Sequence, residues 1–119
     1  MLLVFLLLID IRLAAALYAL PAIGCFHGAQ SIGVLPHLWG YRRYNVNDKS
    51  HNNWLASILA LGEGWHNNHH HFPSSAKQGF YWWEIDLTYY GLNILSALGL
   101  IWDLRKVPSE VLSNKRVSQ

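Results

Sequence analysis

The apolar positions of this chain form long runs near its start instead of alternating with polar ones. Residues 1–9 are apolar throughout, Asp10 and Arg12 interrupt them, and residues 13–35 are again mostly apolar. A helix needs about 20 predominantly apolar residues to cross a bilayer. We therefore expect residues 13–35 to form one complete transmembrane helix. Residues 1–9 are too short to span alone, so we expect them to end a preceding helix, with a turn at residues 9–12.

Two other interpretations of the apolar runs are weaker. A signal peptide would begin with positive charge, and no Lys or Arg precedes Arg12. The alternative of two buried helices in a soluble core stays open, because His27 and Gln30 interrupt the second run. We favour the membrane, since 52% of the chain is hydrophobic and only 13% is charged.

The second half of the chain alternates polar loops with shorter apolar segments. Residues 40–53 are polar and turn-prone, which predicts a loop that leads into a helix at residues 54–61. Polar residues punctuate the apolar segment 84–102, so we expect an amphipathic or buried helix packed beneath the membrane domain, and no third span. The nearby aromatic residues are expected at the membrane interface: Trp82, Trp83, Tyr89 and Tyr90. We expect the polar tail from Pro108 to fray.

Positive charge is distributed unevenly along the chain. Eight of the nine Lys and Arg residues follow Pro36, and only Arg12 precedes it. By the positive-inside rule, we expect an integral membrane protein whose residues after Pro36 face the cytoplasm. The formal net charge of +2 on such a membrane-facing chain gives no argument for nucleic-acid binding.

Histidines cluster at one point of the sequence, between Gly62 and Pro73. Four of the chain's seven histidines fall within residues 66–71. On a helix, His66, His69 and His70 would share one face, because residues three and four apart are neighbours. His71 would lie well round the helix from them. The spacing therefore predicts three imidazoles that converge on one metal site or on two adjacent ones.

Imidazole is a neutral ligand that suits zinc, copper, iron and nickel. Cys25 is the only cysteine, which excludes disulfides within the chain and cysteine-rich structural zinc sites. The alternative is a surface histidine run that binds metal adventitiously. A purification tag is disfavoured, because this cluster is internal and is interrupted by Asn67 and Asn68.

Residues 62–73 read Gly-Glu-Gly-Trp-His-Asn-Asn-His-His-His-Phe-Pro. This segment resembles the third histidine box of the integral-membrane fatty acid desaturases, and of the acyl-CoA (stearoyl-CoA, delta-9) type in particular. Further matching segments lie at residues 37–44, 52–54, 78–86 and 99–104. The resemblance therefore covers most of the chain from about residue 27 to residue 108.

The resemblance implies an all-α membrane protein, with transmembrane helices followed by a cytoplasmic helical cap that carries a histidine box. It implies two iron ions, activation of O2, and insertion of a cis double bond into a fatty acyl chain of an acyl-CoA or acyl-lipid. Electrons would come from a donor of cytochrome b5 or ferredoxin type. By position, the iron ligands would be His37, His66, His69 and His70. Glu63, Asn67 and Asn68 are near enough in sequence to be candidates for orienting these ligands. The alternative is that Glu63 is a helix-terminal charge and that the asparagines cap or turn the chain.

Two departures from the family pattern change the expectation for this chain. The family has two earlier histidine boxes, whereas no histidine here precedes His27. The family also places an asparagine that holds a metal-bound water four residues before the His37 position, where this chain has Gly33. Gly33 can offer only its backbone or space for solvent. Pro36, directly before His37, is also unusual for the pattern and is expected to reshape the helix end.

We therefore expect the C-terminal portion of a desaturase, inactive as an isolated chain. Residues 1–36 would be the transmembrane part, residues 37–107 the cytoplasmic metal-binding helical region, and residues 108–119 the tail. Two alternatives stay open. One is a degenerate membrane protein that binds metal without oxygen chemistry, and the other is a related di-iron membrane hydroxylase.

Overall fold

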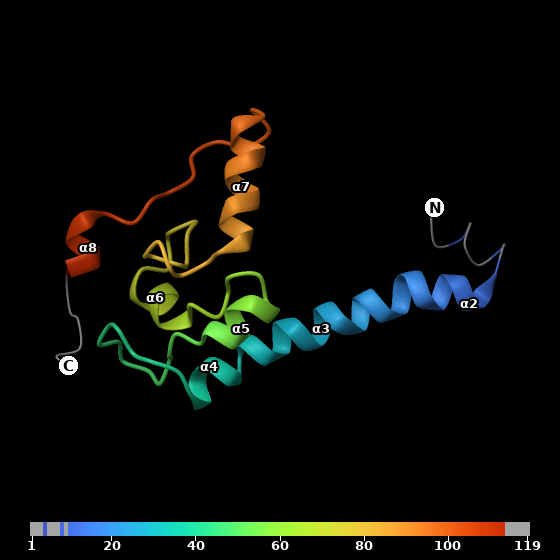
Figure 1. The fold of residues 1–119 in the computed structure, drawn as a ribbon, viewed down its shortest axis with the longest axis horizontal. Coiled ribbons are helices and arrows are strands. Elements are labelled where there is room, and N and C mark those ends of the chain that lie inside the picture. Colours follow the sequence, from blue (N-terminus) through green and yellow to red (C-terminus); the bar gives the residue numbers. More distant parts are fainter. Residues whose placement is uncertain (1–3, 5–7, 9, 114–119) are drawn as a thin grey trace. The chain divides into compact units, whose positions relative to one another are not determined.

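The computed structural model describes Val4, Leu8 and residues 10–113 of the chain (Figure 1). Helices supply the regular secondary structure of this described part. It contains no strand, and isolated β-bridges join Asn52 to Tyr41 and to Trp65. The predicted all-α class is therefore confirmed as a mostly helical fold. The chain divides into two compact units, residues 1–30 and residues 31–119.

One continuous apolar helical stretch dominates the N-terminal part. Helix α2 (Ile11–Ala14), a π-helical turn η1 (Ala15–Ala19) and helix α3 (Leu20–Ile32) follow one another directly, and the short helix α4 (Leu35–Leu38) comes after a turn. Among the described residues, Ile11–Leu38 is one helical segment of 28 residues whose length and composition are sufficient to cross a membrane. Its large apolar side chains are exposed, as at Leu17, Leu20 and Phe26.

The start of this helical stretch differs slightly from the expected turn at residues 9–12. The carboxylate of Asp10 accepts hydrogen bonds from the backbone N–H of Arg12 at 2.7 Å and of Leu13 at 3.4 Å. Asp10 is thus an N-cap that satisfies free N–H groups of the first turn. The helix consequently begins at Ile11 and includes Arg12. The expected preceding helix in residues 1–9 lies almost wholly outside the described residues and stays a prediction.

The helix end before His37 has an altered shape, as expected from Pro36. The chain turns at Gly33 and Val34, and Pro36 then occupies the first turn of α4, where its missing N–H is tolerated. The polar loop expected at residues 40–53 follows. Asn53 caps the next helix, α5 (Trp54–Leu59), by accepting a hydrogen bond from the N–H of Ala56 at 2.9 Å.

The last two helices differ from what the sequence predicted. Helix α7 (Leu87–Ala97) confirms a helix within the segment 84–102, but the alternative of a buried helix is wrong, because no residue of α7 is buried. The buried groups of this unit come mainly from the segments before α7. Residues 109–113 do not fray but form helix α8 (Ser109–Ser113). Hydrogen bonds from the rest of the unit reach the carbonyls of Val111 and Leu112.

Polar side chains fill much of the interior of the second unit. Fully or almost fully buried polar residues outnumber the large buried apolar ones, and they include Asn52, Asn53, Asn67, Asn68, Glu84 and Asp86. Buried polar groups are tolerated only when they are hydrogen-bonded. These residues are bonded to one another and to the backbone, so the loops around the histidine cluster are fixed by a polar network.

Gly62 provides a test of this packing. Its φ is +126°, and a Cβ added there would lie 2.9 Å from Cγ of Asp86. We expect Gly62→Ala to lower the free energy of unfolding by about 1–3 kcal/mol through backbone strain and steric conflict. Gly91 in α7 is the matched control, since a Cβ there meets nothing within 4 Å. Gly91→Ala is expected to stabilise by about 0.5–1 kcal/mol. Urea unfolding in detergent measures both, and equal effects would contradict this explanation.

Candidate metal centre

Three histidines from two separate helices converge on one point. Helix α6 (His66–His71) places His66 and His70 one turn apart, and their Nε2 atoms are 3.0 Å from each other. His37 in α4 approaches from the other side, with its Nε2 3.2 Å from Nε2 of His66. The nearest ring nitrogens of these three residues all lie within 4.8 Å of one another.

The loop between α4 and α6 brings His37 to this cluster. The carbonyl of Pro36 accepts a hydrogen bond from the N–H of His51 at 2.7 Å. The next residue, Asn52, is bridged to Tyr41 and to Trp65, directly before His66. Asn53 adds a further contact, donating its N–H to the carbonyl of Gly64 at 2.8 Å. A short stretch of extended backbone therefore links the segment containing His37 to the start of α6.

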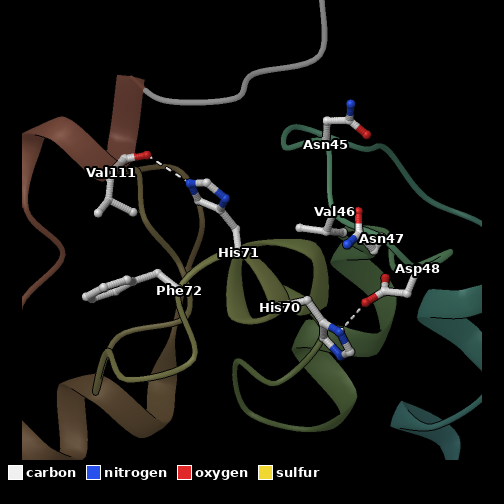
Figure 2. A pocket seen from close by; sticks show the side chains of 8 residues that line it. All are labelled: Asn45, Val46, Asn47, Asp48, His70, His71, Phe72 and Val111. Carbon is white, nitrogen blue, oxygen red and sulfur yellow. Dashed lines mark hydrogen bonds and ion pairs between the residues drawn. The ribbon is translucent and has the colours of Figure 1, made fainter.

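The other two histidines of α6 take different positions. The ring of His69 lies 6.1 Å from that of His66 and 5.8 Å from that of His70, between ring centroids, so it borders the cluster. It is not among the three histidines whose nitrogens converge. His71 stacks on Tyr44 at 3.9 Å between centroids, and its Nε2 lies 3.0 Å from the carbonyl oxygen of Val111. Figure 2 shows His70 and His71 turned toward different partners.

Asn67 and Asn68 hold α6 from its buried side. The side chain of Asn67 accepts hydrogen bonds from the backbone N–H groups of Arg43 and Tyr44 at 2.9 and 2.8 Å. It also donates to the carbonyls of Tyr44 and Ser50. Asn68 pairs with Asn52 and donates to a carboxylate oxygen of Glu84 at 2.9 Å. Across the described residues, neither asparagine bonds to a histidine ring. Both orient the helix as a whole.

Glu63 and Gly33 are the other two residues that we predicted to lie near the metal ligands. The negative charge of Glu63 is close enough to favour the protonated form of His69. Gly33 lies in the turn between α3 and α4, one turn before His37. Whether these residues act on a bound metal stays a prediction.

Sequence reasoning missed Asp48, which contacts the cluster directly. Its Oδ2 is 2.5 Å from Nδ1 of His70, and its Oδ1 accepts the backbone N–H of Ser50 at 2.7 Å. Figure 2 shows this pair at the edge of a cavity of about 510 Å³. Asp48 lies 22 residues before His70 in a polar loop, and no motif marks it. Its only signal in the sequence is the Asp-x-Ser spacing typical of a side chain that bonds to its own loop.

The surroundings favour unprotonated imidazole. Burial, followed by the neighbouring His70 and His37, lowers the pKa of His66 to about 4. Burial and His70 also lower the pKa of His69, against the opposing effect of Glu63. For Asp48, partial burial acts to raise the pKa, but hydrogen bonds from Ser50 and His70 outweigh it and lower the pKa to about 2. Neutral imidazole is thus favoured at His66 and His69, and one carboxylate, that of Asp48, lies next to the cluster.

This donor set fits a transition metal. Neutral imidazoles bind zinc, copper, iron and nickel, whereas magnesium and calcium prefer oxygen ligands. His37 and His66 are 29 residues apart in the sequence, and their Nε2 atoms still approach to 3.2 Å. Ring nitrogens this close to one another either share a hydrogen in a hydrogen bond or bind the same cation. A histidine cluster of this kind could bind a metal ion.

The fold and the cluster define a helical protein with one membrane-length apolar helix and a histidine-rich candidate metal site. No family model matches the chain. It is 48% identical over 90 residues to an acyl-CoA C20 Delta5-desaturase of Anemone leveillei, covering 76% of this chain and 28% of that protein. It is 47% identical over 75 residues to an sn-2 palmitoyl-lipid 9-desaturase of Nostoc sp. (strain 36), covering 63% and 26%.

A chloroplastic palmitoyl-monogalactosyldiacylglycerol delta-7 desaturase of Arabidopsis thaliana is 40% identical over 112 residues, covering 84% of this chain and 30% of that protein. The chain belongs to the membrane fatty acid desaturase family. It spans between a quarter and a third of the length of these curated relatives, and it corresponds to their C-terminal part. The predicted family is therefore confirmed.

Proposed function

We propose that this chain is the C-terminal part of a membrane di-iron desaturase and that it supplies iron ligands through His37, His66, His69 and His70. The observation that carries the proposal is the approach of ring nitrogens from His37, His66 and His70 to within 4.8 Å of one another. The relatives support the same chemistry, because those compared above are named as desaturases of acyl-CoA or of acyl-lipids.

In the proposed reaction, a CH2–CH2 unit of a fatty acyl chain loses two hydrogens and becomes a cis double bond. One O2 is reduced to two waters, with two electrons and two protons supplied from outside and two electrons taken from the substrate. When bound, iron would supply the one-electron redox steps that O2 and an aliphatic C–H bond require. We propose a cytochrome b5-like or ferredoxin-like donor for the external electrons.

The residues of this chain would hold and orient that centre. Each imidazole offers one nitrogen to the metal, and the buried asparagines fix the helix that carries three of the four histidines. Four imidazoles provide fewer ligands than two iron ions require. The isolated chain is therefore expected to need further ligands from the rest of the protein before it can turn over.

The substrate proposal is a fatty acyl chain, with an acyl-CoA substrate and the delta-9 position as the more specific prediction. The relatives differ in both respects. The Anemone protein is named for acyl-CoA and Delta5, whereas the Nostoc and Arabidopsis proteins are named for palmitoyl-lipids at positions 9 and delta-7. The relatives therefore support the acyl class more strongly than any one head group or position.

We further propose that Ile11–Leu38 crosses the bilayer and that residues after Pro36 face the cytoplasm. Exposed apolar side chains along the segment support the first statement, since they would be covered by lipid or by other helices. The concentration of Lys and Arg after Pro36 supports the second.

Iron analysis of detergent-purified protein tests the proposal. We expect the complete desaturase to carry two spin-coupled iron ions, visible by Mössbauer spectroscopy, and the 119-residue chain to be iron-poor. A complete protein that binds one redox-silent zinc ion would contradict the desaturase proposal and favour the metal-binding remnant. A hydroxylated acyl product would favour the hydroxylase instead.

A further inference from the structure

The carboxylate of Asp48 joins its own loop to one ring of the cluster. Its Oδ1 accepts the N–H of Ser50 at 2.7 Å, which fixes the direction of the carboxylate. Its Oδ2 lies 2.5 Å from Nδ1 of His70. The loop that carries Asp48 is itself held to α6, because Asn67 donates to the carbonyl of Ser50. The side chain of Asp48 is 38% exposed, but these contacts hold it beside the ring as a hydrogen-bond acceptor.

A fixed carboxylate determines which nitrogen of a neutral imidazole carries the proton. Neutral imidazole has one N–H and one lone pair, and an ionised carboxylate can only accept a hydrogen bond. The contact at Nδ1 therefore selects the Nδ1–H form and leaves the lone pair on Nε2. In His70 that Nε2 is the atom 3.0 Å from Nε2 of His66. The Asp48 contact thus directs the donor atom of His70 into the cluster.

His70 needs such a restraint more than its neighbours do. Its side chain is 32% exposed, whereas His66 is more buried and contacts both His37 and His70. An exposed imidazole near the end of a short helix rotates and exchanges tautomers unless a second partner holds it. In the described structure, the ring nitrogens of His70 contact Asp48 on one side and His66 on the other.

We infer that Asp48 is a positioning residue that holds His70 in the Nδ1–H tautomer with Nε2 directed at the metal position. The role of Nε2 as a ligand rests on the proposed function. The choice of tautomer and the orientation of the ring do not, because they follow from the two hydrogen bonds of the carboxylate.

The tautomer is measured on the full 119-residue chain in detergent, without metal. The chain is labelled with ¹⁵N in the histidine rings, and His70→Gln identifies the His70 signals. The measurement is made at about pH 9, well above the ordinary imidazole pKa of about 6.5. We expect the Nδ1–H form to predominate for His70 in the unaltered chain. In Asp48→Ala we expect the Nε2–H form to predominate. An unchanged tautomer would overturn the inference.

Asp48→Asn is the sharper variant, because it keeps the shape of the side chain. Ser50 and His70 contact different oxygens of Asp48, and an amide places an NH2 group at one of these two positions, so it cannot accept from both in this geometry. We therefore expect Asp48→Asn to lose the tautomer preference while circular dichroism shows the helical content unchanged. Asp103→Asn is the control for charge, since Asp103 is an exposed carboxylate elsewhere in the same unit. It is expected to leave the His70 signals unchanged.

A titration with Co²⁺ alone separates this inference from the proposed function. If the cluster binds Co²⁺, we expect Asp48→Ala to weaken binding about 10–100-fold and Asp103→Asn to leave it unchanged. If the unaltered chain binds no Co²⁺ while the tautomer still changes in Asp48→Ala, the metal proposal fails for this chain and the positioning role of Asp48 is supported. Equal Co²⁺ affinity in the unaltered chain and in Asp48→Ala would overturn the positioning role.

Discussion

Replacing His66 with glutamine in the complete desaturase is expected to reduce unsaturated product by more than about 100-fold. Removing a side chain that only orients a metal ligand already lowers metal affinity or activity by about 10–100-fold, and loss of a ligand itself is expected to cost more. His66 lies at the middle of the cluster, with its Nε2 3.2 Å from His37 and 3.0 Å from His70. Glutamine has a similar length but offers a weakly donating amide in place of an imidazole. Gas chromatography of fatty acids from expressing cells measures the product, and metal analysis of the purified protein measures iron.

The neighbouring His71 provides the matched control for His66. It lies on the same short helix but stacks on Tyr44 and contacts the carbonyl of Val111. We expect His71→Gln to keep its iron and to change product yield by no more than the loss of expressed protein explains. If both variants lost iron equally, the cluster would not be the site of the metal, and a general effect on folding would account for the result.

Removing the carboxylate of Glu84 is expected to lower the free energy of unfolding by about 3–5 kcal/mol, the usual cost of breaking one side of a buried ion pair. Glu84 is fully buried and forms an ion pair with Arg43 at 2.5 Å. It also accepts hydrogen bonds from the hydroxyl of Tyr41 and from the amide of Asn68. The backbone N–H of Tyr81 also donates to Glu84, at 3.1 Å. Glu84→Ala would therefore remove the acceptor of several donors, among them the mostly buried guanidinium of Arg43 and the buried amide of Asn68.

The pKa values around this ion pair agree with a strongly coupled network. Burial and the hydrogen bond to Glu84 raise the pKa of Tyr41 to about 12, so its hydroxyl stays a donor at neutral pH. Burial acts to lower the pKa of Arg43, but the charge of Glu84 and the hydrogen bonds to Tyr41 and Glu84 together outweigh it and raise that pKa. The guanidinium of Arg43 also lies over the ring of Tyr81 at 4.0 Å from its centroid.

Urea unfolding, followed by tryptophan fluorescence, measures the effect of Glu84→Ala. Trp65 is a suitable reporter, because it is buried and its indole donates to the carbonyl of Ile85 at 2.8 Å. Glu110→Ala is the control, since Glu110 is exposed on α8. We expect its effect to stay within about 0.5 kcal/mol. The double variant Arg43→Met, Glu84→Met is expected to be more stable than Glu84→Ala, because it leaves no unpaired charge. A loss below about 1 kcal/mol in Glu84→Ala would contradict a structural role for the pair.

Several features were predictable because they depend on local spacing. The His66 and His70 pair follows from helical periodicity alone, since residues four apart meet on one face. The apolar helix follows from its composition, and the loop before α5 follows from its polar, turn-forming residues.

The wrong predictions concern packing, which local patterns do not encode. The apolar residues of α7 suggested burial, yet none of them is buried, because Asp86 and Thr88 hold only the start of that helix against the rest of the unit. The polar residues after Pro108 suggested fraying, yet α8 forms and its carbonyls contact His71 and Tyr44. Distant segments therefore decided both outcomes, because they contact only the start of α7 but do contact α8.

The amino-acid sequence by itself determined the family, the helical class, the membrane-length segment and the histidines that share a face, because each is written in consecutive or regularly spaced residues. Only the tertiary structure decided which side chains surround those histidines. Asp48 is 22 residues from His70, and Glu84 is 41 residues from Arg43. Such pairs form only when the loops fold around α6. The residues next to a charged side chain in a loop do not indicate which distant side chain will bury it and pair with it.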